Sequence, residues 1–395
     1  MELDHEYRPR IHFTPAKNWM NDPNGLVWHK GEYHLFFQHN PQGTQWGHMS
    51  WGHAVSKDLL MWEELPVAIA EDQDGAIFSG SAISDGDDIV AIYTRHTEGN
   101  QTQCIARSKD NGRTFIKFEN NPVLDENKSD FRDPKVFRYK DYWIMCVAQP
   151  HEHQISFYSS NDLIAWKHLS DFGPAAAVGG VWECPDLFSL RLDNKEVWVL
   201  IVSLNPGGMH GSGTQYFIGD FNGTTFVPSY STDKPQWLDY GKDNYAGVTF
   251  NNEPNGKRIL IGWLANWSDV KSHPATPWTT QMTIPRELGL ANYNNEIVLT
   301  QKPMCEALYE LKVKTPTSGI IGLSGFVKIG YNADKQVVFM NEFEASYCPS
   351  SEDLHLLVVI DQSSIELFTG DGIRSISLAL FPEPGSSRGL ELFQE

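Results

Sequence analysis

Cysteine is scarce in this chain, and its pattern excludes several kinds of site. The five cysteines never adopt the Cys-x-x-Cys spacing that is typical of zinc or redox centres. Their odd number and wide scatter favour mostly free thiols, with at most one or two bridges. They are Cys104, Cys146, Cys184, Cys305 and Cys348.

Basic residues and long apolar runs are also lacking. Lys and Arg number 31 against 50 Asp and Glu, which gives a formal charge of −19, and no basic run stands out. Such a surface repels phosphate backbones and anionic lipids, so we expect neither nucleic acid nor membrane as a partner. No stretch approaches the ~18 apolar residues of a membrane span. An export signal has a cationic stretch followed by an apolar stretch, and the N-terminal Met-Glu-Leu-Asp-His-Glu-Tyr shows neither. We therefore predict that any export signal has been removed or was never present.

Most common catalytic motifs are missing as well. There is no Gly-x-Ser-x-Gly elbow, His-Glu-x-x-His zinc site, Gly-Lys-Ser/Thr phosphate loop or EF-hand calcium loop. The glycine-rich run 207–213 lacks the lysine of a phosphate loop and is interpreted as a connection between strands. His151-Glu152-His153 is interpreted as an exposed turn, so no metal site is predicted.

A repeated turn predicts the fold. Ser56-Lys57-Asp58 followed by Trp62 recurs as Ser108-Lys109-Asp110 with Phe115 and as Ser160-Asn161-Asp162 with Trp166, and a fainter copy contains Asp220. Short aromatic and β-branched runs flank each copy and indicate strands. A period of more than fifty residues is close to the length of one four-stranded propeller blade. We therefore predict a β-propeller of about five blades over roughly residues 5–300, with a two-sheet sandwich as the alternative.

Three carboxylates have similar local surroundings. Asp22 and Asp133 each precede a proline, and Glu183 lies in Trp-Glu-Cys-Pro-Asp. Singly they have simpler explanations: a turn for Asp22, an ion pair with Arg132 for Asp133 and a solvated rim position for Glu183. Acids on the inner strands of different blades can, however, converge on a central funnel. A carboxylate nucleophile and a carboxylic acid are the pair that retaining glycoside hydrolysis requires.

At these segments the chain resembles glycoside hydrolase family 32, which includes invertases, levanases and exo-inulinases. The resemblance covers nearly all of residues 10–300. Besides the three acidic segments, it rests on 46–54 (WGHMSWGHA), 78–81 (FSGS), 180–187 (GVWECPDL), 237–241 (WLDYG) and 261–263 (IGW).

The resemblance implies the fold, the reaction and the residue roles. The fold is a five-bladed propeller, here residues 1–303, followed by a β-sandwich, residues 304–395. The implied reaction is release of terminal β-D-fructofuranosyl residues from sucrose or fructans, without a cofactor or metal. Asp22 is the implied nucleophile, Glu183 the acid and then base, and Asp133 the stabiliser of the transition state. The implied substrate-binding residues are Asn21, Gln38, Trp46, Phe78, Ser79, Arg132, Asp239 and Trp263.

Some features depart from the family or leave choices open. The connection 84–89 is short, and the tail after Met304 is abbreviated relative to the family sandwich, which suggests an internal deletion. The segment from Met304 to Leu311 is a possible short helix.

The run 205–208 (NPGG) favours the levanase and exo-inulinase branch. A transfructosylase and a propeller that binds fructan without cleaving it are the alternatives. An extracellular mature protein is expected, with a cytoplasmic location left open, and the oligomeric state is not predicted.

Overall fold

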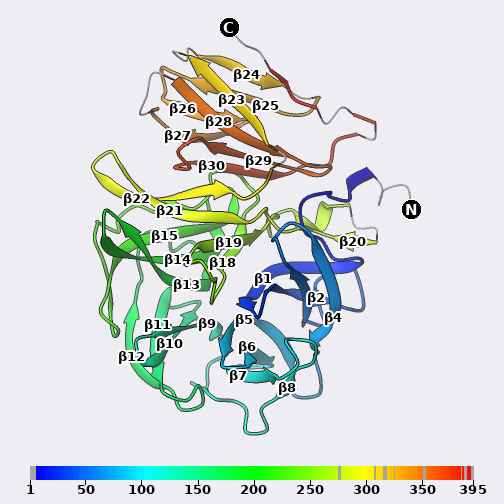
Figure 1. Cartoon of the computed structure of the whole chain (residues 1–395), viewed down its shortest axis with the longest axis vertical. Coiled ribbons are helices and arrows are strands. Elements are labelled where there is room, and N and C mark those ends of the chain that lie inside the picture. The colour runs from blue at the N-terminus through cyan, green and yellow to red at the C-terminus, as the bar shows by residue number, and fades with distance from the viewer. Residues whose placement is uncertain are drawn as a thin grey trace.

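The computed structural model is built almost wholly from β-strands. It describes residues 6–274, 277–306, 308–314, 318–323, 325–349, 353–383, 385–386 and 389–392. Within them, a helical turn that includes Glu6 and Tyr7 and one 3-10 turn, η1 (Val270–Ser272), accompany the strands. Figure 1 shows a large ring of sheets from the N-terminal three quarters of the chain, with the C-terminal sheets packed on one side of it.

Five sheets make up the ring. The first contains β1 (Asn18–His29), β2 (Glu32–Asn40), β3 (Ser50–Ser56) and β4 (Trp62–Ile69), with β20 (Trp278–Thr279) beside β1. The second contains β5 (Ala76–Asp85), β6 (Asp88–Thr97), β7 (Asn100–Ser108) and β8 (Ile116–Lys117). The third contains β9 (Arg132–Tyr139), β10 (Tyr142–Gln149), β11 (Gln154–Ser160) and β12 (Lys167–Phe172). The fourth contains β13 (Val181–Leu192), β14 (Lys195–Gly208), β15 (Gly211–Phe221) and β16 (Phe226–Pro228), with β17 (Gln236–Trp237) beside β15. The fifth contains β18 (Tyr245–Thr249), β19 (Arg258–Trp263), β21 (Arg286–Tyr293) and β22 (Glu296–Pro303).

The innermost strands of these sheets surround one axis. Strand β1 contacts β5, β5 contacts β9, β9 contacts β13, β13 contacts β18, and β18 contacts β1. A separate hydrophobic cluster fills the space between each pair of successive sheets. The predicted five-bladed propeller is therefore confirmed, and the alternative of a two-sheet sandwich for this region is wrong.

The repeated turn joins the third and outermost strands of a blade. Between β3 and β4, the Asp58 carboxylate accepts hydrogen bonds from the amides of Leu60 and Met61, and the Trp62 indole donates to the Leu59 carbonyl at 3.0 Å. Asp162 and Trp166 repeat these bonds between β11 and β12. The spacing seen in the sequence thus reflects one local structure that closes successive blades.

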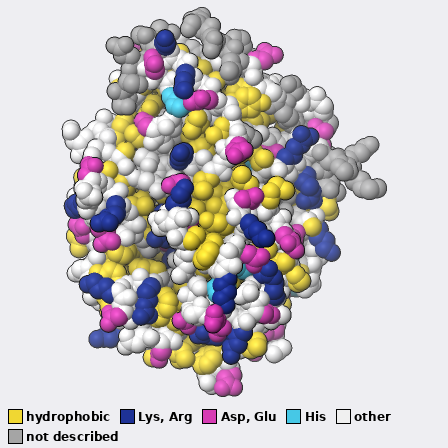
Figure 2. All heavy atoms as spheres, in the orientation of Figure 1, with side chains coloured by type: hydrophobic (Ala, Val, Ile, Leu, Met, Phe, Trp, Pro, Cys, Tyr) yellow, Lys and Arg dark blue, Asp and Glu magenta, His cyan; other side chains and the backbone are white. Residues whose placement is uncertain are grey.

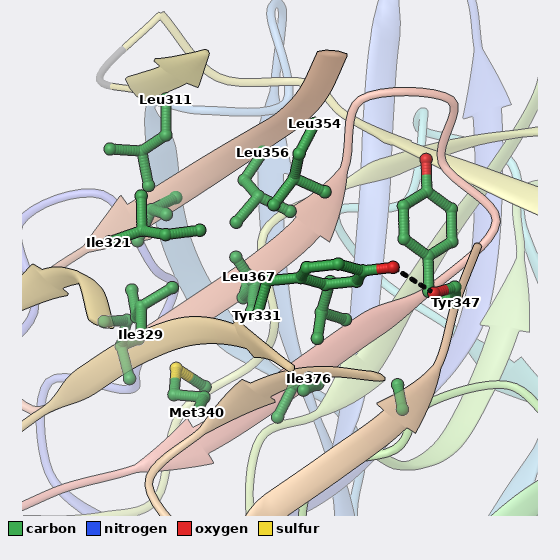
Figure 3. Packing of buried hydrophobic residues seen from close by; sticks show 14 of the residues in the cluster. Leu311, Ile321, Ile329, Tyr331, Met340, Tyr347, Leu354, Leu356, Leu367 and Ile376 are labelled. Carbon is green, nitrogen blue, oxygen red and sulfur yellow. Dashed lines mark hydrogen bonds between the residues drawn. The ribbon is translucent and has the colours of Figure 1, made fainter. Parts of the chain in front are cut away.

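The C-terminal part is a sandwich of two sheets. One sheet contains β23 (Tyr309–Lys314), β28 (Asp353–Ile360), β29 (Ser364–Thr369) and β30 (Ser375–Ala379). The other contains β24 (Gly319–Leu323), β25 (Lys328–Asn332), β26 (Val337–Met340), β27 (Phe343–Ser346) and β31 (Glu391–Leu392). The two sheets enclose a single hydrophobic cluster, and the Tyr331 hydroxyl donates to the Tyr347 carbonyl beside it at 3.4 Å (Figure 3).

The possible helix from Met304 to Leu311 is wrong. Residues 304–306 and 308 are irregular, and Tyr309 already pairs with Val358 in the first sandwich sheet. Residue 307 lies outside the described residues. Leu311 packs into the sandwich core (Figure 3), so a tertiary contact decides the local structure against helix propensity.

The propeller covers one edge of the sandwich. The amides of Tyr240 and Asp243 donate to the carbonyls of Ser375 and Ser377 in β30. This pairing uses backbone groups that a bare edge strand would expose to other chains. The described part of β30 is therefore protected from pairing with another chain.

Buried charges connect the two parts. His12 lies between the carboxylates of Asp361 (2.9 Å) and Glu366 (2.8 Å), and all three side chains are almost fully buried. Arg286 bonds both Glu366 and Asp239. Burial alone lowers the pKa of His12, but its hydrogen bonds to Asp361 and Glu366 raise that pKa to about 9. The charged form of the histidine is therefore part of the folded interface.

Acidic and basic side chains are interspersed on the face that Figure 2 shows, so the net charge of −19 does not gather into one acidic patch there. In the described part of the chain, no helix has the length and apolar character needed to cross a membrane.

Replacing Glu366 by Gln should destabilise the protein strongly. The change leaves Arg286 and protonated His12 buried with one carboxylate fewer, and breaking a buried pair in this way costs about 3–5 kcal/mol. Urea unfolding monitored by tryptophan fluorescence measures the loss. Glu344→Gln is the matched control, because Glu344 pairs with Lys335 on the exposed surface of the same sandwich, where ion pairs contribute little. Equal unfolding midpoints for the two variants would contradict the prediction.

The stability should also fall at alkaline pH. Unfolded His12 loses its proton near pH 6.5, whereas the folded protein keeps it to about pH 9. The contribution, about 3 kcal/mol at 1.4 kcal/mol per pKa unit, is fully present below pH 6.5 and is lost as pH rises through 9. The difference in unfolding free energy between the wild type and His12→Gln should therefore shrink across this window, and a constant difference would contradict the assignment.

Candidate active site

Every innermost strand breaks its regular pairing where it enters one end of the funnel. Register shifts occur in β1, β5, β9, β13 and β18. A bulge of this kind re-aims a side chain that would otherwise follow the alternation of the strand. Asp133, Cys184 and Ala246 have positive φ values of 64°, 48° and 52° at these points. For residues other than glycine this conformation costs energy and is common at functional sites.

Asp22 lies at the bulge of β1. One carboxylate oxygen accepts from the Asn21 amide at 3.0 Å, and the other accepts from the Ser79 hydroxyl of β5 at 2.8 Å. Burial raises the pKa of Asp22, and the nearby charge of Glu183 raises it further, while the bonds from Asn21, Ser79 and Cys184 oppose the rise. Neutral donors alone therefore hold this carboxylate in place.

Asp133 is the most enclosed of the three acids, with 6% of its surface exposed. Its carboxylate accepts from the Cys184 amide at 2.8 Å, and its own amide donates to the Thr94 hydroxyl at 3.0 Å. Burial raises the pKa of Asp133, the charge of Arg132 opposes the rise, and Glu183 and Asp22 add to it, which brings the pKa to about 7. The pKa of Asp133 thus depends on the charges of its neighbours as well as on its burial.

Glu183 is bound by two donors from different blades. The Arg132 guanidinium donates from Nε and Nη2 to one carboxylate oxygen at 3.1 and 3.0 Å. The Tyr245 hydroxyl donates to the other oxygen. Arg132 also pairs with Asp130 at 2.7 Å, so one buried cation lies between two carboxylates. The donors fix the position of Glu183 while 19% of its side chain stays accessible.

These residues line one cavity of 370 Å³. Nine of the expected residues lie on its wall, namely Asn21, Asp22, Gln38, Trp46, Phe78, Ser79, Arg132, Asp133 and Glu183. Trp46 is 53% exposed and its ring meets that of Phe78 edge to face at 6.2 Å. An aromatic rim above a polar, carboxylate-lined floor suits a ligand with apolar ring faces and many hydroxyls, such as a sugar.

Trp263 and Asp239 do not line this cavity. Trp263 is fully buried, donates to the Thr280 hydroxyl at 2.9 Å and packs on Trp267, which does line it. Asp239 accepts from Arg286 and from two serines of β30 at the junction with the sandwich. Both positions therefore support the structure around the site, and neither contacts the space a ligand would fill.

The cavity also contains residues that the sequence did not single out as site residues. These are His96, Gln101, Asp130, Asn205 and Trp267. The His96 ring stacks on the Phe78 ring, with 4.5 Å between the ring centroids. The side-chain oxygen of Gln101 accepts from the Phe131 amide at 2.9 Å. They come from second and third strands and from loops, where nothing in the local sequence marks a side chain as facing the funnel. Asp130 is the one that the sequence could have suggested, because it lies two positions before Arg132, which was already expected to bind substrate.

Fold and site together define a glycoside hydrolase with a carboxylate-lined propeller funnel. Glycosyl hydrolases family 32 N-terminal domain matches residues 12–303, and Glycosyl hydrolases family 32 C terminal matches residues 307–395. The chain belongs to glycoside hydrolase family 32.

Curated relatives extend this likeness over almost the whole chain. It is 39% identical to a levanase of Bacillus subtilis (strain 168) over 466 aligned positions, which cover 99% of this chain and 68% of the levanase. It is 36% identical to the extracellular exo-inulinase inuE of Aspergillus niger (strain ATCC MYA-4892 / CBS 513.88 / FGSC A1513), covering 96% of this chain and 90% of that protein. Because this chain has only 395 residues, the levanase alignment includes residues of the relative that have no counterpart here.

Solved structures agree with the fold. The exo-inulinase from Aspergillus awamori superposes with a TM-score of 0.88 at 32% identity, covering 98% of this chain and 95% of that one. A fructofuranosidase variant from Schwanniomyces occidentalis, complexed with fructosylnystose, gives a TM-score of 0.89 at 30% identity, covering 99% of this chain and 95% of that one.

Replacing Ser79 by Ala should move the acid limb of the pH–rate profile to higher pH. The hydroxyl lowers the pKa of Asp22, so its loss raises that pKa further and delays ionisation of the carboxylate. The pH dependence of kcat/KM on sucrose measures the shift. Ser81→Ala is the control, because the Ser81 hydroxyl, two residues along β5, accepts from the Val136 amide instead of contacting a carboxylate. An unshifted acid limb with a reduced rate would contradict the proposed link to Asp22.

Proposed function

We propose that this chain releases terminal β-D-fructofuranosyl residues from fructans and sucrose by a retaining, double-displacement reaction. The observation that carries the proposal is the convergence of Asp22, Asp133 and Glu183, from three blades, on one 370 Å³ cavity. A cavity of this size encloses a terminal sugar better than the middle of a polymer. The relatives are named levanase, exo-inulinase and invertase, which supports fructosyl substrates.

Asp22 is assigned as the nucleophile. It attacks the anomeric carbon of the terminal fructosyl unit, forms a carbon–oxygen bond to it and displaces the glycosidic oxygen. Asn21 and Ser79 hold its two oxygens from opposite sides, so the carboxylate keeps one orientation. No cation binds Asp22 among the described residues, so its attack does not require breaking an ion pair.

Glu183 is assigned as the acid and then the base. Its proton passes to the departing glycosidic oxygen. In the second step it takes a proton from a water molecule, whose oxygen bonds to the anomeric carbon as the bond to Asp22 breaks and releases that carboxylate. Arg132 and Tyr245 keep the carboxyl group in place for both steps. Its partial exposure supports the second role, since the base must be reached by water.

Asp133 is assigned to binding of sugar hydroxyls. It is buried and its backbone is strained, and the Cys184 amide fixes one of its oxygens. Such a preorganised carboxylate can strengthen its hydrogen bonds as positive charge develops on the sugar ring. Asn21, Gln38, Trp46, Phe78 and Arg132 are proposed to complete the fructose pocket.

We further propose residues 1–303 as the catalytic domain and 304–395 as an abbreviated sandwich, with an extracellular location. The last strand of the propeller ends at Pro303, and the first of the sandwich begins at Tyr309. Relatives named extracellular exo-inulinase support the location.

Asp22→Ala and Glu183→Ala should each abolish most fructose release from sucrose, inulin and levan. Loss of the acid and base alone lowers the rate by about 10²–10⁴-fold, and loss of the nucleophile removes the covalent step. Chromatography of the released sugars near pH 5 to 6 measures the effect and ranks the substrates. Asp220→Ala, at an exposed position on β15, should match the wild type. A folded wild type that releases no fructose from any of the three would contradict the proposal and favour a binding propeller.

The products of sucrose should separate hydrolysis from fructosyl transfer. Hydrolysis yields fructose and glucose in equal amounts, whereas transfer to a second sugar leaves less free fructose than glucose. Measuring both over time at low and high sucrose tests the assignment. A fructose deficit at low sucrose would favour a transfructosylase acting through the same residues.

A further inference from the structure

A second cavity lies at the opposite end of the inner strands. It has a volume of 210 Å³ and is lined from the ends of strands whose beginnings form the active site. In β9, for example, Asp133 faces the first cavity and Phe137 the second. Four strand residues span about 13 Å, so the two cavities are separate places in the molecule.

Buried polar groups close the funnel between the cavities. The Lys135 ammonium pairs with Asp186 at 3.1 Å and donates to the Thr249 carbonyl. The Asn251 amide bridges the carbonyls of Ala82 and Val136 at 2.8 and 3.0 Å. A ligand in the second cavity therefore cannot be an extension of the substrate in the first.

Arg258 brings to the second cavity a positive charge that no described carboxylate contacts in an ion pair. Its guanidinium donates to the Thr249 hydroxyl and the Phe250 carbonyl at 3.4 and 3.2 Å and lies over the Phe188 ring at 5.2 Å. No described carboxylate forms an ion pair with it, unlike Arg107, Arg113 and Arg286. Burial lowers the pKa of Arg258, as expected for a cation that lacks a partner.

Arg138 provides a second guanidinium at the same cavity. It is exposed, donates to the Asp141 carbonyl at 2.6 Å and stacks on Trp143 at 4.8 Å. It too forms no ion pair with a described carboxylate. Stacking on an aromatic ring orients the planar fork of an arginine, which leaves its remaining donors available for a bidentate anion.

The neighbouring acids bind groups other than Arg258. One oxygen of Asp186 accepts from Lys135 and from the amide and hydroxyl of Thr249, while the other oxygen has no partner among the described residues. Glu253 accepts from Tyr33, Asn255 and Lys257. Neither forms an ion pair with Arg258, although both favour its charged form.

We propose that this second cavity is a binding site for a small anion that carries a phosphate or carboxylate group, held by Arg138 and Arg258. Paired guanidiniums suit such groups, and hydrogen bonds to charged partners are the stronger kind. Ser189 and Asn252 add neutral polar groups, while Trp143, Trp198 and Phe188 provide apolar walls. The site is independent of the fructosyl chemistry proposed for the first cavity.

Isothermal titration of the full chain with inorganic phosphate and with citrate, at constant ionic strength and in saturating fructose, tests the proposal. The wild type should bind at least one probe saturably with one site per chain, and the tighter probe identifies the preferred group. Arg258→Gln and Arg138→Gln should each weaken binding about tenfold or more, because each removes a charge-assisted hydrogen bond worth about 1.5–3 kcal/mol.

The controls separate this site from other effects. Arg113→Gln removes an arginine that is paired with Glu32 on the surface, so it should bind the probe as the wild type does. Arg138 is exposed, and a melting temperature equal to that of the wild type would show that its variant is folded. Absence of saturable binding, equal affinity in the arginine variants, or displacement of the probe by fructose would each overturn the proposal. None of these results depends on whether sucrose or fructan is cleaved.

Discussion

Five strands share one narrow axis in this protein, and their crowding governs the rest of the structure. Regular strands would point alternate side chains toward the axis at every second residue, and five of them would overfill the centre. Each strand instead loses its regular pairing near its beginning, at Asp22, Ser79, Asp133, Cys184 and Ala246. The bulges open a cavity there and turn polar groups into it. The energetic cost of the positive φ angles at Asp133, Cys184 and Ala246 is offset by the packed blades around them.

The same constraint explains the electrostatics of the funnel. Side chains buried between the inner strands are removed from bulk water, so a charge there needs a partner. Below the active site, Lys135 and Asp186 form an ion pair that closes the funnel. Among the described residues that line the active-site cavity, the carboxylates of Asp22, Asp130, Asp133 and Glu183 surround one arginine, Arg132. Burial together with the neighbouring negative charge raises the pKa of Asp22 and of Asp133. This imbalance makes Asp22 and Asp133 harder to ionise than exposed carboxyl groups.

The sandwich stabilises the propeller through contacts that lie away from the active-site cavity. Asp239, implied by the family resemblance as a substrate residue, lies with Arg286 and Glu366 at the junction of the two parts. The chain segment around Asp239 also pairs with the edge of β30. The last blade and the sandwich therefore share buried charges and backbone bonds, and a shortened sandwich can still close its exposed edge by using the propeller as a neighbour.

Much of this protein could be predicted from its sequence. The Ser-x-Asp turn is a local structure, so its repetition indicated blades without knowledge of any long-range contact. The three acidic motifs were equally visible, because proline and turn residues mark the places where strands begin.

The placement of the other site residues could not be predicted in this way. Trp263 is fully buried at the end of β19, whereas Trp267 lies in the turn that follows and lines the cavity. His96 and Gln101 lie within ordinary strands. The segment near Tyr309 suggested a helix until pairing with β28 decided otherwise. Local sequence thus determined where the turns and acids occur, whereas the packing of blade against blade decided which side chains face the axis, since that direction depends on bulges and on neighbours far apart in the chain.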